Sequence, residues 1–121
     1  MLFRSDMVLE HVEGNPQQAV DEARRVLREG GVAVITSVFD YPIHNYPSDF
    51  WRFTPDSLSW LHRGFSQVLE VGGWGNPYVW ELMKDGMFIH GVPYAAWHPY
   101  HWIATKNDPK RPICVWIVAV K

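Results

Sequence analysis

The chain has 121 residues, a formal net charge of −2, and is 47% hydrophobic, 15% aromatic and 20% charged. This composition excludes a disordered or fibrous chain and favours one globular domain with a hydrophobic core. The slight acidity excludes nucleic-acid recruitment by a basic surface, and apolar runs such as 113–120 are far shorter than the roughly 20 residues of a membrane-spanning helix. Cys114 is the single cysteine, which excludes an internal disulfide and fits the cytoplasm, where we expect the protein.

The first predicted elements are a strand, a helix and a second strand. A short apolar run with a polar end, Asp6–His11, predicts a buried strand. Asn15 suits an N-cap and Pro16 the first helical position, and the pair Gly30-Gly31 suits the helix end. The run Val32–Val38, nearly all β-branched or small, predicts the second strand. Such a succession with tight loops predicts a βαβ unit with parallel strands.

A long loop without a clean period follows over Phe39–Phe53. Because it leaves the carboxyl end of a parallel strand, where open α/β sheets bind ligands, we expect it to shape a ligand site. Thr54-Pro55 then predicts a second helix. Ser66–Val71 reads as a third strand, and the glycine-rich stretch Gly72–Asn76 as a turn.

The C-terminal third is harder to read. Asn76-Pro77 predicts a short helix over Tyr78–Lys84, and Ile113–Val120 reads as the last strand. Residues 85–112 are rich in aromatics and prolines, and we expect an irregular insertion or lid there. Residues 1–121 therefore predict one α/β domain of three or four strands with flanking helices, the last strand antiparallel.

Four short stretches occur in an informative order. They are Val8–Val12 (VLEHV), Ala23–Val32 (ARRVLREGGV), Tyr41–His44 (YPIH) and Trp51–Pro55 (WRFTP). Together they resemble the type 11-like, small-molecule branch of the class I S-adenosylmethionine-dependent methyltransferases. The resemblance implies that the chain holds the fourth strand, the helix after it and the fifth strand of a Rossmann-like methyltransferase sheet.

The same resemblance implies O- or N-methylation of a small-molecule acceptor, with S-adenosylmethionine as the methyl donor. It places the donor near Leu9, Glu10 and His11, and makes His11 a candidate general base. Residues 1–5 do not resemble the family's glycine-rich donor turn. We therefore expect a C-terminal fragment, inactive alone, in which residues 1–5 are a non-native leader and most of the donor site is absent.

The long loop also carries the densest polar and aromatic cluster of the sequence: His44, Tyr46, Asp49, Trp51 and Arg52. One hypothesis is an acceptor pocket in which Trp51 stacks on the acceptor and Arg52 holds an anionic group. The alternative is an internal brace, with Arg52 paired to Asp49 and capping nearby carbonyls. Structural roles also remain open for Glu10, as a solvated or ion-paired carboxylate, and for His11.

Two further expectations concern metals and partners. His90, His98 and His101 match no closed zinc pattern, so we expect no metal site. If Asp6–His11 lies at the edge of a truncated sheet, its unpaired backbone favours a homodimer through that edge. The alternative function is a non-catalytic α/β half-domain that binds a protein partner through its aromatic tail.

Overall fold

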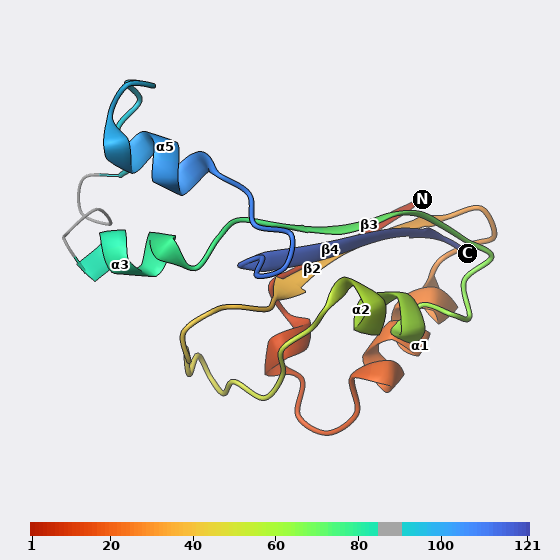
Figure 1. Cartoon of the computed structure of the whole chain (residues 1–121). Helices are drawn as coiled ribbons and strands as arrows, with labels where there is room; N and C mark the ends of the chain where they lie inside the picture. Colours follow the sequence, from red (N-terminus) through yellow and green to blue (C-terminus); the bar gives the residue numbers. More distant parts are fainter. Residues whose placement is uncertain (85–90) are drawn as a thin grey trace.

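The computed structural model describes residues 1–84 and 91–121, which form a four-stranded mixed sheet with helices on one side (Figure 1). The strand order is β1-β2-β4-β3. The elements in chain order are β1 (Leu2–Asp6), the 3₁₀ helix η1 (Leu9–His11), α1 (Pro16–Val26), β2 (Val32–Val38), α2 (Pro55–Leu61), β3 (Gln67–Trp74), α3 (Tyr78–Lys84), α5 (Pro99–Thr105) and β4 (Cys114–Val120). The predicted α/β fold is confirmed.

The N-terminal βαβ unit is present, but its first strand lies earlier in the chain than predicted. β1 pairs parallel with β2 from Leu2 opposite Val32 to Asp6 opposite Thr36. The predicted strand Asp6–His11 is wrong, because Met7 has a positive φ of 52° and the chain then turns into η1. Leu2–Ser5 are thus part of the sheet.

Helices α1 and α2 start where the sequence predicted them to start. The Asn15 side chain accepts a hydrogen bond from the Gln17 amide at 2.9 Å, and Pro16 opens α1. At α2, Thr54 and Ser57 form a reciprocal capping box that satisfies two backbone amides. α1 ends at Val26, a few residues before the predicted Gly30-Gly31 stop.

The C-terminal half of the sheet is antiparallel. β4 runs between β2 and β3 and is antiparallel to both, which confirms the predicted direction of the last strand. The predicted turn at Gly72-Gly73 is wrong, because both glycines lie within β3. A Cβ on Gly72 would lie 2.9 Å from the Trp116 ring, so glycine allows a close approach between strands here.

The region predicted as irregular contains the helix α5. Its cap is His98, whose side chain accepts the Tyr100 amide at 3.2 Å. The predicted helix Tyr78–Lys84 is confirmed as α3, and it packs against α5 through Leu82 and Ala104 at one end of the sheet (Figure 1). Residues 85–90, including the candidate ligand His90, lie outside the described part of the chain.

The main core lies between the sheet and the helices α1, η1 and α2, which all cover the same face (Figure 1). Alternate residues of β2 and β4 point into it: Ala33, Ile35, Val115, Ile117 and Ala119 are all buried. No helix among the described residues is long and apolar enough to cross a membrane. This two-layer arrangement leaves the carboxyl ends of β1 and β2 beside the long loop.

Candidate functional site

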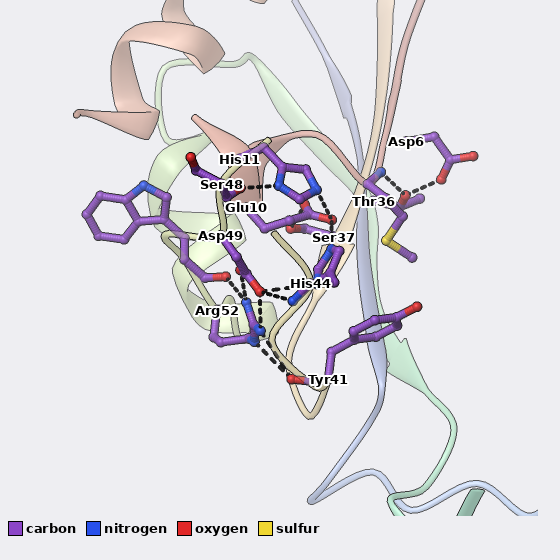
Figure 2. Close-up of polar contacts among 12 residues, drawn as sticks. Asp6, Glu10, His11, Thr36, Ser37, Tyr41, His44, Ser48, Asp49 and Arg52 are labelled. Carbon is purple, nitrogen blue, oxygen red and sulfur yellow. Dashed lines mark hydrogen bonds and ion pairs between the residues drawn. The ribbon is translucent and has the colours of Figure 1, made fainter. Parts of the chain in front are cut away.

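A cluster of polar side chains gathers at the carboxyl ends of the parallel strands β1 and β2 (Figure 2). η1, just after β1, provides Glu10 and His11, and the end of β2 provides Ser37. The loop after β2 brings His44 and Asp49 to the same place. Ligands of open α/β sheets bind at this end of the strands, so the position itself marks a candidate site.

Glu10 is the centre of the cluster and is fully buried. Its Oε2 atom accepts a hydrogen bond from Ser37 Oγ at 2.6 Å. Its backbone carbonyl accepts the amides of Phe50 and Trp51 at 2.8 and 3.2 Å, which ties the long loop to η1. Its Oε1 atom has no hydrogen-bond partner among the described residues. A buried carboxylate oxygen without a partner is costly, and a ligand that supplies one is stabilised there.

The two histidines next to Glu10 present the same nitrogen to it. The Nε2 atoms of His11 and His44 each lie 4.0 Å from Glu10 Oε1. His11 Nδ1 lies 2.5 Å from the Ser48 carbonyl oxygen, which only accepts, so Nδ1 donates the proton. His44 Nδ1 lies 3.2 Å from the carboxylate oxygen Oδ2 of Asp49, so this Nδ1 also carries the proton. In the neutral rings, both Nε2 lone pairs are therefore free on the side of Glu10.

Asp49 and Arg52 form an ion pair that holds the loop together. Arg52 donates to both carboxylate oxygens of Asp49, at 2.5 and 2.8 Å, and to the carbonyls of Tyr41, Pro42 and Trp51. The guanidinium holds the pKa of Asp49 well below its usual range, and the carboxylate raises the pKa of Arg52. All three guanidinium nitrogens thus donate within the chain, which is the geometry of an internal brace.

The other residues expected at the site lie at its margin or outside it. Trp51 Nε1 donates to the Val12 carbonyl at 2.8 Å, so the indole links the loop to the segment after η1. Tyr46 is 86% exposed. The Leu9 side chain packs in the main core. Among the expected residues, the structure therefore brings together Glu10, His11, His44, Asp49 and Arg52.

A cavity of about 410 Å³ adjoins the cluster on the His44 side. Its wall is largely apolar and consists of Tyr41, Pro42, His44, Trp80, Met83 and Lys84. The Tyr41 ring contacts His44 and Trp80, with ring centroids 4.9 and 4.8 Å apart. Trp80 Nε1 donates to the Asp40 carbonyl at 2.9 Å, which fixes the indole against this wall.

The sequence analysis missed Ser37, Tyr41 and Trp80. Ser37 had a detectable signal, because it is the polar residue on the inward face of β2, which it shares with Ala33 and Ile35. Tyr41 lies in the YPIH motif. Trp80 carried no such signal, since only the folded chain brings α3 beside the loop.

Residues 2–35 match the family model described as "Methyltransferase domain". The match spans β1, η1, α1 and the first part of β2, and supports a class I S-adenosylmethionine-dependent methyltransferase-like domain. The fold agrees with half of such a Rossmann-like domain, and the family in general uses S-adenosylmethionine as methyl donor. No curated protein and no solved structure shows a significant match to the chain.

Proposed function

We propose that the chain is part of an S-adenosylmethionine-dependent methyltransferase that methylates an oxygen or nitrogen of a small molecule at the Glu10–His11–His44 cluster. The observation that carries the proposal is the position of Glu10. This buried carboxylate, one oxygen of which has no hydrogen-bond partner among residues 1–84 and 91–121, lies within the stretch that matches the methyltransferase family and just after β1.

The chain offers one end of a donor site. S-adenosylmethionine supplies a methyl group on a sulfonium, which is already activated for transfer. Glu10 and His11 line the end of that site nearest to the acceptor, because they follow β1 directly and border the cavity side of His44. Leu9 contributes through its main chain, since its side chain is 3% exposed and lies in the core.

His11 is the candidate general base. Its Nδ1 proton is held by the Ser48 carbonyl, so Nε2 is the basic atom. The acceptor lone pair forms the new bond to the methyl carbon, the carbon–sulfur electron pair stays on sulfur, and the acceptor proton passes to Nε2. Glu10 Oε1, 4.0 Å away, stabilises the resulting imidazolium. A positioned base of this kind contributes about 10²–10⁴-fold in rate.

The cavity beside His44 is our candidate acceptor pocket. Its wall is mostly apolar and aromatic, with His44 and Lys84 as polar groups, which is typical of small-molecule sites. An acceptor with an apolar body fits there, with its hydroxyl or amine directed toward the histidines. Arg52 plays no part in binding the acceptor in this proposal, because its donors are engaged in the brace.

The test is a methyl-transfer assay with labelled S-adenosylmethionine and a panel of small hydroxyl and amine acceptors. The enzyme is the product of the longest open reading frame that contains this chain. His11→Ala should lower kcat by about 10²–10⁴-fold, with circular dichroism confirming that the variant is folded. His98→Asn is the matched control, because asparagine can also cap α5. Equal loss in both variants, or none in His11→Ala, contradicts the role of His11.

A second function is favoured by the exposed aromatic residues of the C-terminal half. Tyr94 is 99% exposed, Trp97 83% and Trp102 64%. Exposed aromatics of this kind are typical of protein interfaces, so a non-catalytic half-domain would use them to bind a protein partner. In that case no acceptor would be methylated, and alanine substitutions at Trp97 and Trp102 would abolish partner binding, whereas His11→Ala would not.

A further inference from the structure

We propose that Glu10, His11 and His44 form a binding site for one divalent first-row transition-metal ion, with Zn²⁺ as the best fit. One ligand atom from each residue lies within 4.8 Å of the others. Two imidazole nitrogens and one carboxylate oxygen form a ligand set that zinc uses in catalytic sites, where a fourth position stays open for water or substrate. The sequence analysis expected no metal because it considered only His90, His98 and His101.

The outer contacts of the two histidines fit this role. A metal-bound imidazole usually donates its other N–H to a carboxylate or a backbone carbonyl, which fixes the tautomer and the ring orientation. His11 Nδ1 is held by the Ser48 carbonyl, and His44 Nδ1 faces the Asp49 carboxylate. Asp49 is itself held by Arg52. Both rings are therefore already oriented with Nε2 toward one point.

Glu10 supplies the independent observation. It is fully buried, and its Oε1 atom has no hydrogen-bond partner in the described part of the chain. The basic groups that the described residues place within 4.0 Å of this carboxylate are the imidazoles of His11 and His44. Ser37 holds Oε2 and leaves Oε1 directed at both Nε2 atoms (Figure 2). A divalent ion at this point gives the buried carboxylate a cationic partner.

The ligand atoms must move closer together to bind the ion. Two ligand atoms at about 2.1 Å from Zn²⁺ are roughly 3.4 Å apart at the tetrahedral angle, against 4.0 Å between Glu10 Oε1 and each Nε2 atom and up to 4.8 Å within the set. The side chains of His11 and His44 are 18% and 27% exposed, so the site opens to solvent on one side. That open side allows a water molecule or an acceptor oxygen to become the fourth ligand.

The consequence for catalysis rests on the proposed function, whereas metal binding does not. A bound Zn²⁺ lowers the pKa of a coordinated hydroxyl and so activates an oxygen acceptor. His11 Nε2 is then a ligand and no longer the base. If a chelator abolishes methyl transfer, the metal ion activates the acceptor. If methyl transfer persists in the chelator, His11 acts as the base. If the ion binds but no methyl transfer is found, the metal site stands and the proposed function fails.

The experiment is a titration of the untagged, chelator-treated chain with Zn²⁺ by calorimetry, and with Co²⁺ by visible absorption. We expect one equivalent of each ion, and d–d bands for Co²⁺ that are typical of a tetrahedral or five-coordinate nitrogen and oxygen site. Uptake of less than 0.2 equivalents (about one chain in five) at a roughly 100 μM excess of ion would overturn the proposal.

The variants assign the ligands. His44→Ala removes a ligand from the partly exposed loop, and Glu10→Gln removes the charge but keeps an oxygen for Ser37. Each should weaken Zn²⁺ binding by at least about 100-fold, with circular dichroism confirming the fold. His98→Asn changes a histidine on α5 and should bind Zn²⁺ as the unchanged chain does. If His98→Asn loses the ion as much as His44→Ala, the ion binds elsewhere and the proposal is wrong.

Discussion

The Oε1 atom of Glu10 lies 4.0 Å from Nε2 of His44, although the two residues are 34 positions apart in the chain. The contact is made because η1 follows β1, the loop follows β2, and the two strands are parallel neighbours. The parallel pairing therefore determines which side chains meet. It also explains why a short 3₁₀ helix and a loop without regular structure can present a defined set of ligand atoms.

Arg52→Ala should destabilise the protein rather than weaken acceptor binding. The change removes the guanidinium donor from the buried carboxylate of Asp49, which keeps the His44 amide, and from the carbonyls of Tyr41 and Pro42. Because Arg52 is itself 29% exposed, we expect a loss of about 2–3 kcal/mol, below the full cost of breaking a buried pair. Urea unfolding measures the loss. A raised acceptor KM at unchanged stability would instead assign Arg52 to the acceptor pocket.

Asp49→Asn tests the orientation of His44. The carboxylate lies 3.2 Å from His44 Nδ1 and accepts the His44 backbone amide at 2.9 Å. Asparagine keeps the size but removes the charge, so the His44 ring should be held less firmly and Zn²⁺ affinity should fall by about 10–100-fold. The titration with Co²⁺ should show altered d–d bands. An unchanged affinity and spectrum would show that Asp49 only braces the loop.

His62 should make stability fall as the pH is lowered from 7.5 to 5.5. The side chain is 1% exposed, its Nδ1 donates to the Leu58 carbonyl, and burial lowers its pKa below the ordinary histidine value of about 6.5. The unfolded chain therefore binds a proton at a higher pH than the folded chain does. The contribution of His62 to the free energy of unfolding is fully present above the unfolded pKa of about 6.5. It decreases as the pH falls from there toward the lower pKa of the folded state, by at most about 1.4 kcal/mol per pH unit.

The check is the free energy of unfolding at both pH values for the unchanged chain and for His62→Phe. Phenylalanine does not titrate, so the difference between the two proteins should change with pH in the stated direction. A difference that is the same at pH 5.5 and 7.5 would show that His62 is not the titrating group.

Arg4→Pro should disrupt a homodimer formed through β1. β1 is an edge strand of the sheet. The Met1 carbonyl and the Met7 amide both form hydrogen bonds with β2. The residues of the other alternate set, Leu2, Arg4 and Asp6, therefore direct their amides away from β2, toward the open edge. Proline at position 4 removes one outward amide and spares the β1–β2 bonds. Light scattering should give a dimer for the unchanged chain and a monomer for the variant. A dimer in both would place the interface elsewhere.

The parts of the fold that were predicted from sequence have strong local signals. Val32–Val38 is mostly β-branched and entirely buried or half-buried, and its bounds as β2 agree with the prediction. Asn15-Pro16 and Thr54-Pro55 start α1 and α2 because caps act on neighbouring amides. β1 was missed because it is an edge strand with alternating exposure, so Arg4 and Asp6 interrupt the apolar run that a buried strand would show.

The site was predictable only in part. Glu10 and His11 were identified from the resemblance at the strand end, and His44 from the polar cluster in the loop. Their convergence with Ser37 was not predictable, because it depends on β-sheet register and on a loop path tied by Phe50 and Trp51 to the Glu10 carbonyl. The acceptor cavity was missed because Trp80 comes from a distant short helix.

The central claim, that Glu10 belongs to a methyltransferase site, is tested most directly by titrating S-adenosylhomocysteine into the product of the longest open reading frame that contains this chain. Calorimetry should show one binding site, and Glu10→Gln should weaken binding by at least about tenfold, or ~1.4 kcal/mol, while His98→Asn leaves it unchanged. No binding, or equal binding by Glu10→Gln and the unchanged protein, would contradict the account.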